Sequence, residues 1–347
     1  MEYAPMRQPG FWDWEARQSK LNQKKDLLVR LNEIISWETF RPLLEQIHDK
    51  PRKNNAGRKP MDVIVMFKLL VLQQLYNISD EELEYQVSDR LSFMQFLGLG
   101  LADEVPDATT VWLFRKQLSE QQLIEALFEQ FDGYLIEQGY AAQGGQIIDA
   151  TLIPVPKQHN SDDENKHIKQ GEASQLWQDK PHKRTQKDTD ARWTKKGSKS
   201  HFGYKDHISI DVEHGLIRRY VVTDASVHDS QVLGQLLDEN NTSDRIWADS
   251  AYRSEAIEST LELLGFDSQI HERAYRNAPL SDEQKQANRV KSKTRAKGEH
   301  IFGAWVMQMG GKLVRSIGLL RVKAHLGLKN LTYNLMRYTY LQTQAID

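Results

Sequence analysis

The chain has 347 residues, of which 39% are hydrophobic, 27% are charged and none is cysteine, and its formal net charge is -2. The apolar content excludes wholesale disorder, and the lack of cysteine excludes disulfides, thiolate nucleophiles and cysteine-ligated zinc. The length indicates one large domain with a smaller one, and the near-neutral charge neither favours nor excludes a nucleic-acid partner.

The most apolar segment, residues 61–76, is predicted to be a buried helix with Pro60 in its first turn. It is shorter than the roughly 20 residues that a membrane span needs, and it contains Asp62 and Lys68. The N-terminal segment is polar and mixed in charge, so no secretory signal is predicted. We therefore expect no membrane association and a cytoplasmic protein, for which the absence of cysteine is also typical.

The rest of the first 140 residues is predicted to be helical. Ser79 and Glu82 have the spacing of a capping box, and the helix that follows carries Leu83, Val87 and Leu91 at helical intervals. Residues 106–109 form another start signal, which leads into a long helical segment that reaches residue 139.

Short helices joined by tight breaks fit two arrangements. One is a small helical bundle, and the other is a helix-turn-helix in which residues 109–116 form the recognition helix, with Arg115 and Lys116 as candidate DNA contacts. The pattern alone favours the bundle, because packed helix pairs are far commoner than helices that read DNA.

The pattern changes at Gly144 and Gly145. Residues 146–153 form a short apolar run that predicts a buried strand. Residues 154–200 form a long polar loop or insertion, and the sequence leaves open whether it is an ordered DNA clamp or a flexible loop. The remaining segments are predicted to be a hairpin (207–212 and 216–223), a helix (230–240), a strand (244–249), a helix (254–264), a strand (267–271) and a helical C-terminal third. This order predicts a mixed α/β sheet flanked by helices.

Three acidic residues stand out by their positions. Asp149 lies inside an apolar strand, where a charge is costly unless it is paired or binds a metal, and Asp249 ends a strand where open α/β sheets place ligand sites. Glu299 follows Lys291 and Arg295 at intervals of four residues on a predicted helix. Three such carboxylates would form a hard oxygen set for Mg²⁺ or Mn²⁺. A helix cap or an ion pair is the commoner role for any one of them.

Basic and aromatic residues mark two further segments. Lys291, Lys293, Arg295 and Lys297 resemble a phosphate-contacting stripe, although a solvated helix face explains the run equally well. In the insertion, aromatic side chains alternate with lysines in a composition suited to stacking on unpaired bases, at Trp177, Trp193 and Phe202.

Five ordered segments resemble the DDE transposases of bacterial insertion sequences, in the InsH-like group: IIDATLIPVPKQ, KGSKSHFGYKDHISID, VVTDASVHDS, WADSAY and RAKGEHIFG. Residues 57–118 are similar to the helical domain that precedes the catalytic domain in this group. The resemblance implies an α/β, RNase H-like catalytic domain at 141–340, with the insertion at about 154–200. It also implies an all-α DNA-binding domain at 1–140, with its core at about 45–120.

Matching those segments makes Asp149, Asp249 and Glu299 the catalytic acids and metal ligands, with two Mg²⁺ ions per site and Mn²⁺ as a substitute. Arg295 would contact phosphate. The implied partners are double-stranded DNA, as terminal inverted repeats and as target, and further copies of the chain in a homodimer or larger assembly. The location would be the bacterial cytoplasm, on the nucleoid when DNA is bound.

Two departures from the family pattern affect only the auxiliary phosphate contacts. Ser292 stands where the family often has a tyrosine, and Val306 stands where a lysine is expected, so that Lys312 is the next candidate. Two rival functions remain: a nuclease of the same fold that cuts without joining, and a DNA-binding remnant without turnover. The presence of all three acids disfavours the remnant.

Overall fold

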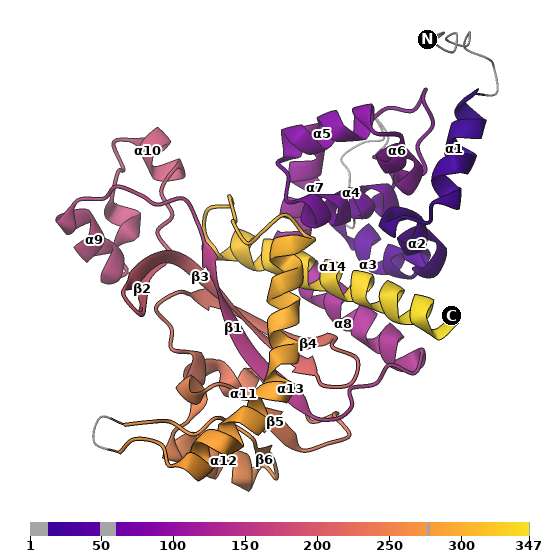
Figure 1. The fold of residues 1–347 in the computed structure, drawn as a ribbon. Coiled ribbons are helices and arrows are strands. Elements are labelled where there is room, and N and C mark those ends of the chain that lie inside the picture. Colours follow the sequence, from indigo (N-terminus) through magenta and orange to yellow (C-terminus); the bar gives the residue numbers. More distant parts are fainter. Residues whose placement is uncertain (1–12, 49–59, 276–277, 347) are drawn as a thin grey trace, which may run out of the picture.

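The computed structural model describes residues 13–48, 60–275 and 278–346, in which a mixed sheet has helices on both faces and a group of N-terminal helices beside it (Figure 1). The start of the chain, where no secretory signal is predicted, lies outside the described residues. The N-terminal helices are α1 (Asp13–Gln23), α2 (Leu27–Ile34), η1 (Trp37–Phe40), α3 (Arg41–Leu44), η2 (Glu45–His48), α4 (Val63–Tyr76), α5 (Asp80–Asp89), α6 (Leu91–Leu97), α7 (Ala108–Glu120) and α8 (Leu123–Glu137).

Helix α4 is buried on nearly all sides, as its composition predicts. It begins after Asp62, whose Oδ1 accepts hydrogen bonds from the amides of Ile64 and Val65 at 2.8 and 3.3 Å. Pro60 therefore precedes the helix, and its predicted place in the first turn is wrong. The side-chain cap sets the start because it satisfies two amide donors that the helix leaves free.

Three other predictions in this region are corrected. Ser79 caps α5 by accepting from the amide of Glu82, but the Glu82 carboxylate accepts from Gln86 instead of completing a capping box. Helix α5 ends at Asp89, so Leu91 belongs to α6. The long segment after residue 106 is divided into α7 and α8 at Gln122, which has a left-handed backbone with φ of 55°.

The sheet combines an antiparallel half and a parallel half. Strand β1 (Gln146–Pro154) pairs along its whole length with β3 (Lys199–Asp211), which also pairs with β4 (Ile217–Asp224) and with β2 (Arg192–Lys196), all antiparallel. On its other side β1 runs parallel to β5 (Arg245–Trp247), which is parallel to β6 (Asp267–Ser268). The predicted mixed α/β, RNase H-like sheet is confirmed.

The polar insertion between β1 and β3, whose order the sequence leaves open, contains regular structure. It holds α9 (Asp162–Lys169), η3 (Ala173–Gln175), α10 (Pro181–Thr185) and β2. Glu164 organises this segment, because its carboxylate accepts from Trp177 Nε1 and Lys183 Nζ, both at 2.7 Å. Trp177 is thereby buried inside the insertion and does not present its ring for stacking.

The helices that follow the antiparallel strands are η4 (Asp229–Val232), α11 (Leu233–Leu236), η5 (Ser250–Tyr252) and α12 (Glu255–Leu263), so the helix predicted at 230–240 is shorter than expected. The predicted helix at 254–264 is confirmed, with Ser254 as its N-cap. The strand predicted at 267–271 is limited to two residues.

Two long helices complete the fold. Helix α13 (Asp282–Met307) crosses β1, and α14 (Leu319–Ile346) lies between the sheet and the N-terminal helices (Figure 1). At Gly327 the approach is close: an added Cβ would lie 2.5 Å from the Tyr220 hydroxyl on β4 and 2.8 Å from the Ile124 side chain on α8. Only glycine permits this three-element contact without rearrangement.

The main hydrophobic core is continuous across the two regions. One cluster includes Leu70 of α4, Phe131 of α8, Ile208 of β3 and Leu331 of α14. A second, smaller core lies against β1 and β5 and joins them to α11 and α12. The division near residue 140 falls in the link between α8 and β1, and its meaning as a domain boundary stays a prediction.

Candidate active site

Asp149 lies in the middle of β1, opposite Ile208 of β3, and only 9% of its surface is exposed. Its carboxylate faces α13 at Gly298, where an added Cβ would lie 3.1 Å from Ile147 Cγ2 and 3.8 Å from Asp149 Oδ2. The missing side chain thus lets the helix backbone approach the buried carboxylate. Burial raises the pKa of Asp149, nearby Arg295 opposes this effect, and the charges of Asp249 and Glu299 add to the increase.

Asp249 lies two residues after the end of β5, and the strand register places it beside Asp149. The parallel pair aligns Ile147 with Trp247, so each acid lies two residues beyond the same aligned position on neighbouring strands. Asp249 also caps η5, since its Oδ1 accepts from the amide of Ala251 at 2.8 Å. The capping role and a place at the candidate site are therefore combined in one residue.

Glu299 and Arg295 approach the site from α13. Arg295 Nη2 lies 3.9 Å from Asp149 Oδ1 and 3.7 Å from Glu299 Oε1. The Arg295 side chain is 20% exposed, and its buried Nε has no hydrogen-bond partner among the described residues. The Glu299 side chain is 65% exposed, so this carboxylate is free to move over a larger space than the other two.

The carboxylate oxygens of the three acids are suitable ligands for a divalent cation, but their present arrangement does not form a metal site. Within the part of the chain that the structure describes, no three His, Cys, Asp or Glu side chains are placed to hold one metal ion. Asp149 and Asp249 offer hard oxygen donors on adjacent strands, and the charge of Asp249 disfavours ionisation of Asp149. A cation between them would relieve that repulsion. Glu299 faces Arg295 instead.

The predicted basic stripe on α13 divides into residues with different surroundings. Lys291 Nζ donates to the Ile270 carbonyl at 2.9 Å, and Lys297 Nζ donates to the Val212 carbonyl at 2.9 Å. Lys293 is exposed, whereas Arg295 lies against the acids. The run is therefore neither a uniform solvated face nor a uniform stripe, and contact of these residues with DNA stays a prediction.

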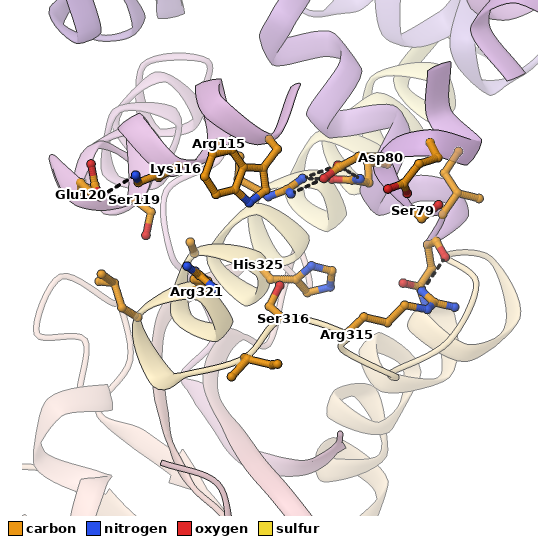
Figure 2. A pocket seen from close by; sticks show the side chains of 18 residues that line it. Ser79, Asp80, Arg115, Lys116, Ser119, Glu120, Arg315, Ser316, Arg321 and His325 are labelled. Atoms are coloured by element: carbon orange, nitrogen blue, oxygen red, sulfur yellow. Dashed lines mark hydrogen bonds and ion pairs between the residues drawn. The ribbon is translucent and has the colours of Figure 1, made fainter. Parts of the chain in front are cut away.

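Arg115 and Lys116 lie elsewhere, on α7. They line a cavity of about 400 Å³ bordered by α5, α7 and the start of α14, where Arg315, Arg321 and His325 are on the opposite side (Figure 2). Arg115 makes a bidentate ion pair with Asp80 at 2.7 and 2.8 Å, and it donates to Gln73 at 2.6 Å. Lys116 lies 3.7 Å from Glu120. Arg115 thus has a structural partner, and its predicted DNA contact stays untested.

Two residues near the acids complete the surroundings of the site. Lys312 Nζ donates to Thr151 Oγ1 at 2.8 Å, which brings the lysine beside β1 although it follows α13. Sequence reasoning missed Tyr252, which is buried and whose pKa is raised by burial and by Asp229 and Asp149. The only sequence signal for Tyr252 is its place at the end of the segment WADSAY.

Two families of transposase domains match this chain. The family described as "Transposase DDE domain" matches residues 141–335, and the family described as "Transposase domain (DUF772)" matches residues 16–117. The chain belongs to the transposase DDE domain family. The predicted transposase, a catalytic member of a DDE family, is confirmed.

Among solved structures, the transposase is similar to the chain in a cryo-EM structure of the piggyBac transposase synaptic complex with hairpin DNA. The sequence identity is 11%, the match covers 93% of this chain and 76% of that chain, and the TM-score is 0.46.

No helix in the described ranges is both long and apolar enough to cross a membrane.

Proposed function

We propose that the transposase hydrolyses the DNA strand at the terminal inverted repeats of its element and joins the freed 3′-hydroxyl to target DNA, using Asp149, Asp249 and Glu299. The observation that carries this proposal is the register of β1 and β5. It places two acids at the same level on adjacent strands, and α13 brings Arg295 and Glu299 to them. The Glu299 side chain is 65% exposed and would have to turn from Arg295 toward the other acids to share a metal ion with them.

The proposed cofactor is Mg²⁺, two ions per site, with Mn²⁺ as a substitute. When bound, such ions activate the attacking oxygen and stabilise the leaving oxygen of an in-line phosphoryl displacement. Asp149, in the middle of β1, and Asp249, two residues beyond β5, would hold the ions. Arg295 would donate to the phosphate, since its buried Nε lacks a partner among the described residues and its Nη2 makes only long contacts.

The proposed partners are double-stranded DNA and further copies of the transposase. Two ends of one element must be held together before joining, so a homodimer or larger assembly is expected. Lys291, Lys293 and Lys297 would contact phosphates around the site. On the N-terminal helices the candidate phosphate contact is Lys116, because Arg115, the other candidate from the sequence, is bonded to Asp80 and Gln73. We also propose that the transposase is located in the bacterial cytoplasm and is associated with the nucleoid when it binds DNA.

The test is a strand-transfer assay with labelled DNA fragments that carry the two flanks of the transposase gene. Wild-type protein with Mg²⁺ should give both cleaved and joined products, and EDTA should abolish both. Asp249→Asn should abolish both steps and keep DNA binding. Asp244→Asn is the matched control, because this exposed acid precedes the opposite end of β5.

Three other results of this assay would each contradict a different part of the proposal. Cleavage without joined product supports a nuclease, and binding without cleavage supports a DNA-binding remnant. Normal cleavage by Asp249→Asn would show that the catalytic acids are misassigned.

A further inference from the structure

A groove of about 760 Å³ lies between the end of β1, the β2–β3 hairpin and the segment after α13. That segment is fixed to β1, because the Val314 amide donates to the Pro154 carbonyl at 3.2 Å. We call this feature the hairpin groove. Among the described residues that line it there are four lysines and a histidine but no acid: Lys157, Lys196, Lys199, Lys312 and His201. Its electrostatic character is therefore suited to an anion.

The hairpin concentrates positive charge at its tip. Lys196 and Lys199 form the last cross-strand pair before a tight turn, in which Gly197 has φ of 62°. Both lysines are exposed, and like charges placed directly opposite one another destabilise a hairpin. A bound polyanion would relieve this repulsion, so the arrangement favours a phosphate-containing ligand.

Lys312 connects the hairpin groove to the candidate active site. Its Nζ is held by Thr151 Oγ1, and Thr151 lies two residues after Asp149 on the same face of β1. With a strand rise of about 3.3 Å per residue, that separation is roughly 7 Å. The Lys312 ammonium interacts with the charges of both Asp149 and Lys196. A DNA strand bound at Asp149 would therefore reach the hairpin groove within a short distance.

Among the apolar residues of the lining, Val306 is 53% exposed, whereas the others are buried in the core: Ile153, Val155, Phe202 and Tyr204. Trp193 lies next to two lining residues: its ring centroid is 5.2 Å from that of Phe202 and 5.9 Å from Lys157 Nζ. Trp193 is 48% exposed. Unpaired bases stack on exposed aromatic rings, whereas paired bases are already stacked inside the duplex.

We propose that the hairpin groove binds unpaired nucleotides of the DNA strand adjacent to the phosphate at Asp149. The lysines contact the strand's phosphates, and the exposed side chains of Trp193 and Val306 contact its bases. This inference rests on the proposed function, because it assumes that the acids act on DNA. It adds a requirement that the acids alone do not impose: the DNA next to the scissile phosphate must be unpaired.

The test measures binding of the full-length transposase to two probes by fluorescence anisotropy. One probe is a blunt hairpin duplex, and the other is the same duplex with a short unpaired oligo(dT) tail. Wild-type protein should bind the tailed probe more tightly, and Lys196→Gln/Lys199→Gln should lose this preference. The slope of log K against log salt on the tailed probe should become shallower by about 1.4, since each phosphate contact to a single strand contributes about 0.7.

Matched variants separate the groove from general charge effects. Lys166→Gln/Lys169→Gln removes the same charge from two exposed positions on α9 and should keep the preference for the tail. Trp193→Ala should lower affinity for the tailed probe about tenfold, and Trp193→Phe should restore most of it.

Two results overturn the inference: equal binding of both probes by the wild type, or an equal loss in the α9 variant. If the wild type cleaves the flanks of its gene without preferring the tail, the inference alone fails. If the wild type neither binds nor cleaves DNA, the proposed function fails with it.

Discussion

Two arginines, each on a helix and each near acids, illustrate different uses of the same side chain. Arg115 on α7 is held by short hydrogen bonds, because both terminal nitrogens bond to Asp80 and one also bonds to Gln73. Arg295 on α13 makes only long contacts of 3.7 and 3.9 Å, and its buried Nε has no hydrogen-bond partner among the described residues. An arginine with its donors satisfied stabilises the fold, whereas one with open donors beside carboxylates is suited to bind phosphate.

The largest effect should come from Arg295→Ala. Removing a cation that stabilises charge at a reacting phosphate typically lowers the rate by about a hundredfold to a thousandfold. We expect that loss in the cleavage assay, with a melting temperature close to that of the wild type. Unchanged cleavage, or a large loss of thermal stability, would mean that Arg295 is a structural residue like Arg115.

Arg115→Ala should act on stability instead. It leaves Asp80 without its bidentate partner in a site where the two side chains are 18% and 16% exposed, and the expected cost is about 2 kcal/mol. Urea unfolding would measure this loss. Lys116→Ala is the matched control, because its exposed pair with Glu120 should contribute less than about 1 kcal/mol. A stable Arg115→Ala protein with weakened DNA binding would reverse the assignment.

The smallest effect concerns a third charged site, between the sheet and α14. Asp206 is fully buried, its Oδ2 accepts from Asn330 Nδ2 at 3.1 Å, and Oδ1 of both residues lacks a partner among the described residues. Burial raises the pKa of Asp206 well above its usual range. A proton on Asp206, or the amide of Asp206→Asn, would supply the missing donor.

Asp206→Asn should therefore stabilise the transposase by about 1 kcal/mol at neutral pH, the usual net contribution of one hydrogen bond. Because the folded-state pKa is raised, the wild-type contribution is complete below the usual carboxyl pKa and is lost as the pH rises toward the folded-state value. The advantage of the variant should accordingly disappear in acid, and thermal unfolding at several pH values would measure it. A variant that is less stable at every pH would show that Asp206 is ionised and paired.

Local sequence patterns predicted the catalytic strand and the apolar face of α13 because each depends on neighbouring residues. The five family segments were needed to select Asp149, Asp249 and Glu299 from 48 acidic residues. Their proximity depends on the pairing of β1 with β5, whose residues lie far apart in the chain and carry no local signal for their register. The position of Glu299 relative to Arg295 follows from helix spacing and was accessible from the sequence.

The structure of the insertion was missed because its helices bury few apolar residues. Only Ile168 is buried in α9, so the segment lacks the periodic apolar pattern on which helix prediction depends. Its end signals were nevertheless present: Ser161 and Glu164 form a capping box, and acidic and basic residues occupy the first and last turns. Trp177 was interpreted as a stacking residue because the sequence does not show that Glu164 and the insertion enclose it.

The close contact at Gly327 limits how domains can be exchanged between transposases. Because α14 enters from the C-terminal end and touches both α8 and β4 there, the N-terminal helices and the sheet share one surface of contact contributed by a third segment. A chimaera that joins the helices of one transposase to the sheet of another must therefore also inherit a matching final helix. Replacing only the N-terminal region, in order to change the DNA sequence that is bound, would break the contact at Gly327. A chimaera that also takes α14 and Tyr220 from the same transposase would keep this contact.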